Sequence, residues 1–510
     1  MFNKVLGGTL HGVEGRLITV EADVSDGLPS FNMVGFLASE VREASDRVRT
    51  SLKNSGFFLS PKKITINLSP ADIRKEGSAF DLPIGVALLA AYGYIPEESV
   101  ENTLLIGELS LNGELKGVRG ILPIVDFAKK NGIDNVILPY DNRREAAVIR
   151  DIRIYGAKNL KEVCNHLTGD KYIEASKHTV MDKLQYDYNF DFSDIRGQEG
   201  MKRATEIAVA GMHNIIFAGP PGAGKSMIAK RIPTIMPDLS YDESVELTKI
   251  YSVKGMLGPD EGLIVNRPFR TPHHSITAQS LIGGGKLPKP GEISLAHHGV
   301  LFLDELLEFQ KNTIEMLRQP MEDCVITISR MYGSYTFPCN FMLVAAMNPC
   351  PCGYFPDRAK CHCTQLQIDR YLRKLSRPML DRMDMCLQVR RVKYEELCNI
   401  KIGEKSSDIK QRIEKVHNIQ YERLKGCGLR FNSQIPSSLI DEMCMLDENM
   451  KIYIKDIFEQ YQMTARGIGK ILKVARTIAD LNASKEVTKD HILEALSYRV
   501  NELWQEGDGI

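Results

Sequence analysis

The segment Gly219-Pro-Pro-Gly-Ala-Gly-Lys-Ser226 fills every fixed position of the pattern G-x-x-x-x-G-K-[ST]. It stands between a short apolar run, residues 214–218, and a stretch that favours a helix. Glycines in such a loop let backbone N–H groups approach an anion at a helix N-terminus, where the helix dipole is positive. The order of strand, loop and helix therefore predicts a parallel α/β fold around a triphosphate site. The expected contacts come from Gly219, Pro220, Pro221, Gly222, Ala223, Gly224, Lys225 and Ser226.

Two residues of this loop have separate expected roles. Lys225 should reach the terminal phosphates, and the hydroxyl of Ser226 should bind a magnesium ion. The alternative interpretation is a plain glycine turn followed by a lysine that has no ligand. The complete pattern in its strand-to-helix context favours the nucleotide site.

Two further apolar runs end in polar residues, as buried parallel strands do when they deliver side chains to one edge of a sheet. Residues 300–303 are followed by Asp304 and Glu305. We predict that Asp304 holds magnesium and that Glu305 orients or deprotonates the attacking water. Residues 341–347 are followed by Asn348, which we expect to touch the terminal phosphate or its water.

Two arginines are candidates for stabilising the charge of a transition state. Arg382 lies within residues 378–384, and Arg466 opens the amphipathic stretch 464–481. An added arginine can accelerate phosphoryl transfer about a thousandfold or more. Either side chain could equally be an ordinary surface arginine, because the sequence does not place it beside the loop.

The length of 510 residues exceeds what one hydrophobic core usually organises, so we expect about two to four domains. Residues 17–24 and 63–68 read as strands, and residues 38–55 and 82–92 read as helices, which predicts an α/β domain at the N-terminus. Thr464 is a plausible N-cap for a helix over 464–481. The predicted division is an α/β domain over 1–169, a polar linker over 170–192, a parallel-sheet phosphate-loop core over 193–393 and a helical lid over 394–510.

Composition excludes several broad classes of partner. Lys plus Arg and Asp plus Glu both total 65, so no bulk charge draws the chain to nucleic acid or membrane, and any nucleic-acid contact must be local. Residues 1–15 lack the features of an export signal, and the apolar stretch 82–95 is too short and interrupted to span a bilayer. We therefore expect a cytoplasmic protein whose 11 cysteines are reduced thiols.

Four cysteines form two C-x-C pairs directly after Asn348. They are Cys350, Cys352, Cys361 and Cys363. Four thiolates can satisfy tetrahedral zinc in a closed structural site. The spacing is tighter than the common C-x-x-C, so a reduced, metal-free cluster is the alternative, and His362 is an alternative ligand. The paired histidines 273–274 and 297–298 are assigned packing or pore roles, because adjacent residues of a strand face opposite ways.

The order of these motifs resembles the ComM/YifB branch of the magnesium-chelatase-type AAA+ ATPases over nearly the whole chain. The strings that carry the resemblance are Arg270-Thr-Pro-His-His-Ser, Gly283-Gly-Gly, Pro290-Gly-Glu-Ile-Ser-Leu-Ala-His-His-Gly-Val-Leu-Phe-Leu-Asp-Glu-Leu, Leu317-Arg-Gln-Pro-Met-Glu-Asp, Met347-Asn-Pro-Cys-Pro-Cys-Gly and Val474-Ala-Arg-Thr-Ile-Ala-Asp. The resemblance implies an AAA+ core with ATP and Mg²⁺ as cofactors and a ring, commonly a hexamer. It implies that Arg382 reaches the neighbour's nucleotide and that Arg466 acts as a second sensor.

The resemblance also implies contact with single-stranded or branched DNA. Two insertions would face a central pore: one over 269–285 carries Arg270, and the other, a β-hairpin near 325–337, carries Arg330. The implied activity is branch migration of DNA during homologous recombination and natural transformation. One departure is Ser376-Arg-Pro where relatives have Ser-Gly-Pro. Arg377 is therefore an alternative to Arg382 as the arginine finger, the side chain that reaches the neighbour's nucleotide.

The N-terminal segment resembles the Lon-protease fold through Lys75-Glu-Gly-Ser-Ala-Phe-Asp-Leu-Pro and Gly107-Glu-Leu-Ser-Leu-Asn-Gly-Glu-Leu. In this register Ala79 stands near the position of the nucleophilic serine, Leu122 stands where the lysine should be, and Ser78 is one residue away. A serine without an activating base is a weak nucleophile. We therefore expect a non-proteolytic domain that caps a ring or binds a protein partner.

Two other functions remain open at this point. The first is a chelatase motor subunit that remodels a partner during magnesium insertion into a porphyrin. A fused Lon-like domain disfavours it, because dedicated chelatase motors lack that fusion. The second is a nucleotide-gated protein scaffold, in which ATP controls only assembly.

Overall fold

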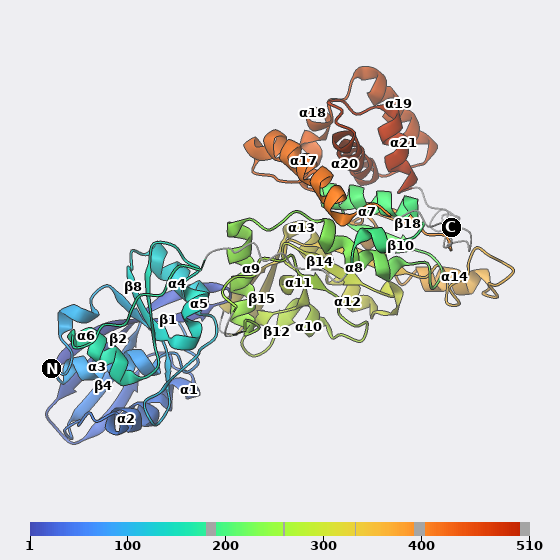
Figure 1. The fold of residues 1–510 in the computed structure, drawn as a ribbon. Coiled ribbons are helices and arrows are strands. Elements are labelled where there is room, and N and C mark those ends of the chain that lie inside the picture. The colour runs from blue at the N-terminus through green and yellow to red at the C-terminus, as the bar shows by residue number, and fades with distance from the viewer. Residues whose placement is uncertain (180–189, 259–260, 332, 392–402, 500–510) are drawn as a thin grey trace.

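The computed structural model describes residues 1–179, 190–258, 261–331, 333–391 and 403–499. Along the chain, an N-terminal α/β domain is followed by a second α/β unit and then by a group of helices (Figure 1). Among the described residues, none of the helices combines the length and apolar character needed to cross a membrane.

The N-terminal domain is built on one mixed sheet of seven strands, with α3 (Asp81–Ala91) and α4 (Ile121–Lys130) on opposite faces. The strand order is β3-β4-β2-β1-β5-β8-β9, in which β1 and β2 pair antiparallel and β5, β8 and β9 run parallel. The strands are β1 (Phe2–His11), β2 (Glu14–Ser25), β3 (Ser30–Val34), β4 (Lys63–Ser69), β5 (Thr103–Leu105), β8 (Asn135–Pro139) and β9 (Arg153–Ala157). The α/β prediction for this region is confirmed.

The predicted helix over 38–55 is two helices, α1 (Ser39–Arg42) and α2 (Ala44–Asn54), which meet at Glu43. The last helix of the domain, α6 (Leu160–Thr168), ends at Gly169, whose φ of 82° suits a residue without a side chain.

Part of the predicted linker is bound to the N-terminal domain. Residues 171–179 form no helix or strand. The backbone N–H of Ser176 donates to the carbonyl of Ile154 at 2.8 Å, and that of Thr179 donates to Ala147 at 2.9 Å. This stretch therefore follows the domain surface, and residues 180–189 of the linker lie outside the described residues.

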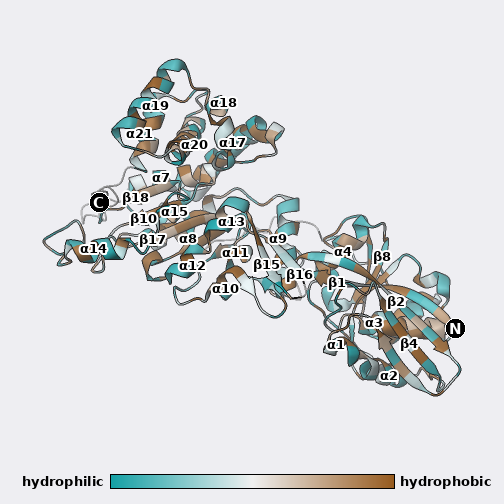
Figure 2. Ribbon diagram, turned by 180° about the vertical axis from the view of Figure 1, so that it is seen from behind, coloured by the Kyte–Doolittle hydropathy of each residue, from teal (hydrophilic) through white to brown (hydrophobic). Residues whose placement is uncertain are grey.

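The second unit contains a five-stranded parallel sheet in the order β11-β14-β17-β10-β18. Its strands are β10 (Ile215–Ala218), β11 (Phe269–Arg270), β14 (Val300–Leu303), β17 (Met342–Met347) and β18 (Met385–Gln388). Every residue of β10, β14 and β17 is buried, whereas buried and more exposed residues alternate along β2 of the first domain. The hydropathy colours also alternate along β2 (Figure 2). Because the strands are parallel, the carboxyl ends of β10, β14 and β17 lie at one edge of the sheet.

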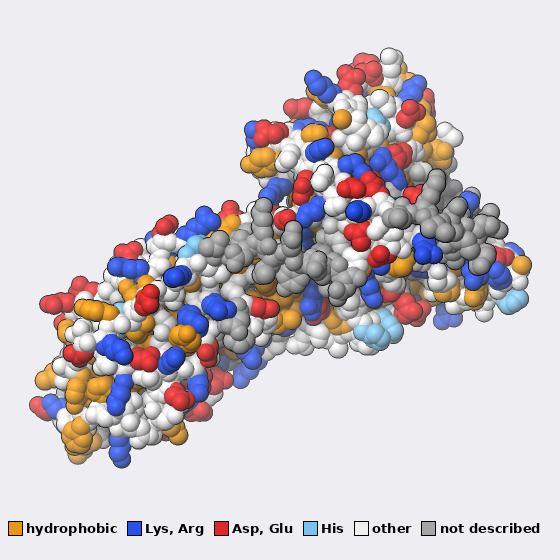
Figure 3. Space-filling model, viewed as in Figure 1, with side chains coloured by type: hydrophobic (Ala, Val, Ile, Leu, Met, Phe, Trp, Pro, Cys, Tyr) orange, Lys and Arg blue, Asp and Glu red, His pale blue; other side chains and the backbone are white. Residues whose placement is uncertain are grey.

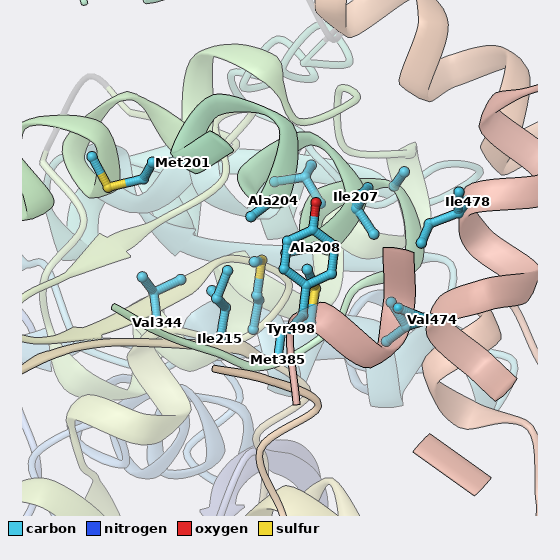
Figure 4. Packing of buried hydrophobic residues seen from close by; sticks show 14 of the residues in the cluster. Met201, Ala204, Ile207, Ala208, Ile215, Val344, Met385, Val474, Ile478 and Tyr498 are labelled. Carbon is cyan, nitrogen blue, oxygen red and sulfur yellow. The ribbon is translucent and has the colours of Figure 1, made fainter. Parts of the chain in front are cut away.

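Helix α7 (Glu199–Gly211) joins the sheet to the C-terminal helices. Its apolar residues pack on the sheet and on α20 (Ala465–Leu481) in one cluster (Figure 4). That cluster includes Ala204, Ile207, Ala208, Ile215, Val344, Met385, Val474 and Ile478. The sheet and the helical lid therefore share a hydrophobic core.

The lid is helical over its described part, as predicted. It comprises α17 (Ser406–Leu424), α18 (Ile440–Cys444), α19 (Glu448–Gln460), α20 and α21 (Lys489–Ser497). The hydroxyl of Thr464 accepts a hydrogen bond from the N–H of Gly467 at 3.1 Å, which confirms the predicted N-cap of α20. Residues 392–402, where core meets lid, lie outside the described residues.

The first domain contacts the second on two surfaces. Lys249 of α9 (Tyr241–Lys254) pairs with Asp126 at 2.7 Å. The second surface is the hairpin of β15 (Val325–Arg330) and β16 (Gly333–Pro338), which confirms the predicted insertion hairpin. There the ring of His11 stacks on Tyr335 with centroids 4.7 Å apart.

Candidate active site

The phosphate loop leaves the carboxyl end of β10, and α8 (Lys225–Ile235) begins at its lysine. Gly222 and Gly224 have φ values of 75° and 88°, a region that favours glycine. At Gly219 a side chain would overlap the carbonyl oxygen of Val389 on the neighbouring segment. The glycines of the motif are thus required by backbone conformation and by close approach.

Lys225 lies buried beside neutral oxygen atoms. Its ammonium group contacts the carbonyl of Gly219, the carbonyl of Pro220 at 3.0 Å and the amide oxygen of Asn348 at 3.3 Å. Burial lowers the pKa of Lys225 to about 8, although the carboxylate of Asp304 acts in the opposite direction. A buried cation without a close anionic partner is suited to receive a phosphate.

Asp304 and Glu305 follow β14 and differ in their contacts and exposure. The hydroxyl of Ser226 donates to Asp304 Oδ2 at 2.7 Å, so two hard oxygen ligands lie side by side, which fits Mg²⁺. Glu305 has a φ of 51°, and its N–H donates to Asp304 Oδ1 at 3.0 Å. Its side chain is 58% exposed, so its carboxylate has access to water.

A residue that sequence reasoning did not place in the site is His274. Its Nδ1 lies 3.7 Å from Glu305 Oε2. His274 follows β11, and β11 pairs with β14, the strand that leads to Glu305. The signal that could have placed His274 in the site is the short strand at residues 269–270, which pairs with β14. The sequence motifs predict only a packing or pore role for His274.

Two adjoining cavities surround the loop. One of about 410 Å³ is lined by residues 221–227, Asp304, Glu305 and Asn348. Another of about 650 Å³ shares residues 222–224 with the first and is also lined by Ile195, Met201 and Arg391. The amide of Gln198 donates to the carbonyls of Ala223 at 3.1 Å and Arg390 at 2.8 Å and fixes the loop between them. Neither this second cavity nor the contacts of Gln198 are predicted by the sequence motifs, because both form only when α7 packs beside the loop.

The structure brings Arg382 and Arg466 together, but away from the phosphate loop. Both line a cavity of about 500 Å³ between core and lid. Arg382 pairs with Glu322 at 2.8 Å and donates to the carbonyl of Arg318 at 3.1 Å. Arg377 is the first residue of the short helix α15 (Arg377–Leu380). Of the described residues, neither Arg382 nor Arg466 lines the 410 Å³ cavity.

The four cysteines after β17 converge. Cys350 Sγ lies 3.3 Å from Cys352 Sγ and 3.7 Å from Cys361 Sγ, and one ligand atom from each of the four residues lies within 4.8 Å of the others. Sulfur atoms around tetrahedral zinc at a Zn–S distance of about 2.3 Å are separated by about 3.8 Å. His362 is exposed and is not part of this group. The geometry fits four thiolate ligands, and zinc itself stays a prediction.

The expectation that adjacent histidines face opposite ways is wrong at both pairs. The rings of His273 and His274, which lie outside any strand, have centroids 4.0 Å apart. At the second pair, His298 has a φ of 57°, and the two rings lie 3.8 Å apart, both beside the carboxylate of Glu246. Alternation holds only for extended backbone. His297 Nδ1 accepts the N–H of Asn340 at 3.0 Å, so its Nε2 carries the proton and donates toward Glu246. That tautomer argues for packing and against metal ligation.

The two predicted insertions meet at Arg330, whose Nε donates to the carbonyl of Gly285 at 3.3 Å. Arg330 is exposed. Arg270 is engaged with Glu292 through two hydrogen bonds of 2.7 and 2.9 Å. The geometry leaves Arg330 as the better placed of the two arginines for contact with an external anion.

In the described part of the N-terminal domain, the candidate nucleophile Ser78 is paired with a carboxylate and not with a lysine. Leu122 is fully buried in α4, and the hydroxyl of Ser78 donates to the carboxylate of Glu108. A serine bound to a carboxylate alone, without a lysine at the position of Leu122, does not form the Ser-Lys pair. Absence of peptidase activity stays a prediction.

The parallel sheet, the phosphate loop and the acidic pair define a P-loop nucleotide-binding protein with a core of AAA+ type. Three family models match in succession: subunit ChlI of Mg-chelatase over residues 20–142, magnesium chelatase subunit ChlI over 191–397 and its C-terminal part over 403–499. The protein YifB of Escherichia coli (strain K12) is 41% identical over 489 residues, which cover 96% of this chain and 95% of YifB. The chain therefore belongs to the ComM/YifB family of magnesium-chelatase-like proteins.

Other relatives support this membership. The competence protein ComM of Haemophilus influenzae is 39% identical over 498 residues, covering 96% of this chain and 95% of ComM. Protein Rv2897c of Mycobacterium tuberculosis (strain H37Rv) is 37% identical and covers 96% of this chain and 97% of its own length. Lon protease 2 of Bacillus subtilis is 28% identical over 193 residues, covering 32% of this chain and 34% of the protease.

Proposed function

We propose that the chain is an ATP-hydrolysing motor that assembles into a hexameric ring and moves on DNA, promoting branch migration in homologous recombination and natural transformation. The observation that carries the proposal is the convergence of Lys225, Ser226, Asp304, Glu305 and Asn348 on one cavity of about 410 Å³. These residues follow the carboxyl ends of three parallel strands and supply a cation, two magnesium ligands, a base and an amide. Its place of action would be the cytoplasm.

Each residue has a defined task in this proposal. Lys225 turns from neutral carbonyls to the terminal phosphates, and Ser226 with Asp304 holds Mg²⁺, which neutralises phosphate charge. The exposed carboxylate of Glu305 orients the attacking water and accepts its proton. Asn348, hydrogen-bonded to Lys225 at 3.3 Å, is positioned to contact the terminal phosphate.

The proposed ring is supported by the shortage of positive charge in the cavity. Among the described residues that line it, Lys225 is the only cation. Phosphoryl transfer gains about a thousandfold or more from an added arginine. Arg382 and Arg466, which line a different cavity of the same chain, are therefore proposed to serve the nucleotide of a neighbouring copy, with Arg377 as the alternative finger.

DNA is proposed as the substrate on two grounds. The two insertions meet at the exposed Arg330, and a relative with 39% identity is named a competence protein. Lysines and arginines are interspersed with acidic residues over the face in Figure 3, so overall charge adds no support. Contact through the insertions is the local kind of contact that a net charge of zero permits.

The test is ATP hydrolysis by the purified chain with and without branched DNA, beside the variants Glu305→Gln and Lys225→Ala. We expect stimulation by DNA, ATP binding without turnover for Glu305→Gln, and loss of nucleotide binding for Lys225→Ala. A turnover rate indifferent to single-stranded, duplex and branched DNA, together with no salt-sensitive binding, contradicts the DNA motor.

Two other functions give different results in the same assays. A chelatase-type motor predicts turnover stimulated by a porphyrin and copurification with a metal-inserting partner. A nucleotide-gated scaffold predicts that Glu305→Gln preserves biological function, whereas a motor with this change binds ATP and stalls. The cofactors of the leading proposal are ATP and Mg²⁺, with Zn²⁺ as a structural ion at the four cysteines.

A further inference from the structure

The segment that carries the four cysteines, together with the helix that follows it, contacts all three parts of the phosphate cavity. It begins at Asn348, so Cys350 lies two residues from the side chain that contacts Lys225. Cys350 and Cys361 are buried, at 0% and 4% exposure, in the same hydrophobic cluster as the sheet residues Leu343 and Met347. Cys350 and Cys361 are therefore packed into the core beneath the site, and Cys352 and Cys363 are partly buried against it.

The second contact is with the phosphate loop itself. The N–H of Gly353 donates to the carbonyl of Cys350 at 2.9 Å and closes a tight turn. A Cβ atom on Gly353 would lie 2.7 Å from Pro221 Cδ and 3.7 Å from Asn348 Cγ. The turn inside the cysteine cluster thus lies directly against the phosphate loop, and the close packing tolerates only glycine.

The third contact reaches the turn that follows Glu305, the proposed base. Tyr371 of α14 (Gln365–Leu372), the helix that follows the last cysteine, is 7% exposed and belongs to the same cluster as Cys350 and Cys361. Its hydroxyl donates to Glu308 Oε1 at 3.1 Å. Glu308 closes the short turn that starts immediately after Glu305. Tyr371 therefore links the core around Cys350 and Cys361 to the turn that follows Glu305.

Backbone groups also point at the sulfurs. The N–H of Phe355 donates to Cys350 Sγ at 3.4 Å. Between Cys350 and Cys363 the loop forms no helix or strand, and turns hold it: the N–H of Cys361 donates to the carbonyl of Asp357 at 2.8 Å, and Arg358 donates to the carbonyl of Cys363 at 3.0 Å. Four thiolates on one ion would join the two ends of this loop at a single point, since metal binding couples to local folding.

We infer that a zinc ion bound by Cys350, Cys352, Cys361 and Cys363 braces the phosphate loop, Asn348 and the Glu305 turn together, so that its occupancy sets the rate of hydrolysis. The inference rests on the proposed ATPase for its kinetic consequence but not for the metal itself. The ion takes no part in the chemistry. Its role is to position Asn348 and Tyr371.

The first measurement is metal content of the full-length purified chain, with a matched set of variants. We expect about one zinc per chain in the wild type. Cys361→Ser should lose it, and Cys361→His should keep it, because imidazole is also a zinc ligand. Cys427→Ser is the control, since Cys427 is exposed in the lid and far outside the cluster. Cobalt substitution should give the absorption of a tetrahedral thiolate site in the wild type.

The second measurement is the split between turnover and binding. Cys361→Ser should lower kcat about tenfold or more, with recovery in Cys361→His, while affinity for ADP stays at the wild-type value. Tyr371→Phe should keep the zinc and still lower kcat, because only its hydrogen bond to Glu308 is removed. This variant keeps the test decisive even where Cys361→Ser fails to fold.

Three results overturn the inference: a chain without metal, cysteines joined in disulfides in the native protein, or zinc loss with unchanged kcat. The proposed ATPase fails separately, when Lys225→Ala leaves nucleotide binding and turnover intact. If the chain binds one zinc and the Lys225→Ala variant hydrolyses ATP like the wild type, only the proposed ATPase site is refuted. A metal-free, DNA-stimulated ATPase refutes the brace alone.

Discussion

Nucleotide affinity should fall as the pH rises through 8, because the cation that receives the phosphates is itself poised to lose its proton. Burial lowers the pKa of Lys225 in the free protein from 10.5 to about 8. The ammonium contacts only neutral oxygens at hydrogen-bond distance. A triphosphate stabilises the charged form, so the pKa rises on binding and a proton is taken up above pH 7.

The magnitude follows from the fraction of Lys225 that is protonated before binding. With a pKa of about 8, that fraction is about nine tenths at pH 7 and about one tenth at pH 9. If only the charged form binds tightly, the apparent Kd rises about tenfold between these two values. At pH 8 binding should take up about half a proton per site.

The assay is calorimetric titration of ADP and ATP from pH 6.5 to 9.5 at constant ionic strength, in buffers with different ionisation enthalpies. Lys225→Arg is the matched control, since a guanidinium stays protonated over this whole range. Its affinity should be lower at pH 7, because a forked group does not fit the site of a point charge, but should vary little with pH. Any titration of the nucleotide itself is common to both proteins.

A wild-type Kd that is flat between pH 7 and 9 refutes the reasoning, as does an equal slope in Lys225→Arg. The first result means that the pKa of Lys225 in the free protein is not near 8. The second means that another group carries the dependence.

Three further changes test the remaining parts of the site. Glu305→Gln should bind ATP like the wild type and lose about a hundredfold or more in kcat, measured by phosphate release beside nucleotide titration, because the amide accepts no proton. Arg382→Ala should keep nucleotide affinity and lose about a thousandfold in kcat; mixing it with inactive Lys225→Ala should restore turnover, and a mixture that stays inactive argues against a shared site. His274→Ala should leave affinity intact and lower kcat by releasing Glu305, whereas an unchanged steady-state rate in the presence of DNA would show that the 3.7 Å contact has no role.

The sequence was sufficient for the part of the site that depends on local pattern. One apolar run leads into the phosphate loop and two others end in polar residues, and parallel pairing alone brings Gly219, Asp304 and Asn348 to one edge. No knowledge of loop paths was needed, because the geometry of a parallel sheet makes the strand ends converge. The same holds for the amphipathic helix at 464–481 and its cap.

The remaining contacts depend on tertiary approach or on unusual backbone conformation. Gln198 reaches the phosphate loop and Arg390 only after α7 folds against the sheet. His274 approaches Glu305 because the strand β11 pairs with β14. With two residues, β11 is too short to be recognised from an alternating pattern in the sequence. At His298 a positive φ reversed the expected direction of the ring, and no local pattern signals that value in a histidine.

The site is thus equipped for binding within one chain but is short of positive charge for hydrolysis. Lys225 is the one cation among the described residues that line the phosphate cavity, while Arg382 and Arg466 line another cavity between core and lid. Moving Arg382 to its own nucleotide would break its contacts with Glu322 and the carbonyl of Arg318 in a packed region. A neighbouring copy that presents this face to the phosphate loop requires no such rearrangement. In the proposed ring, contact between subunits would complete the charge of the site, and the contact between His274 and Glu305 would link the predicted insertion over 269–285 to the same site.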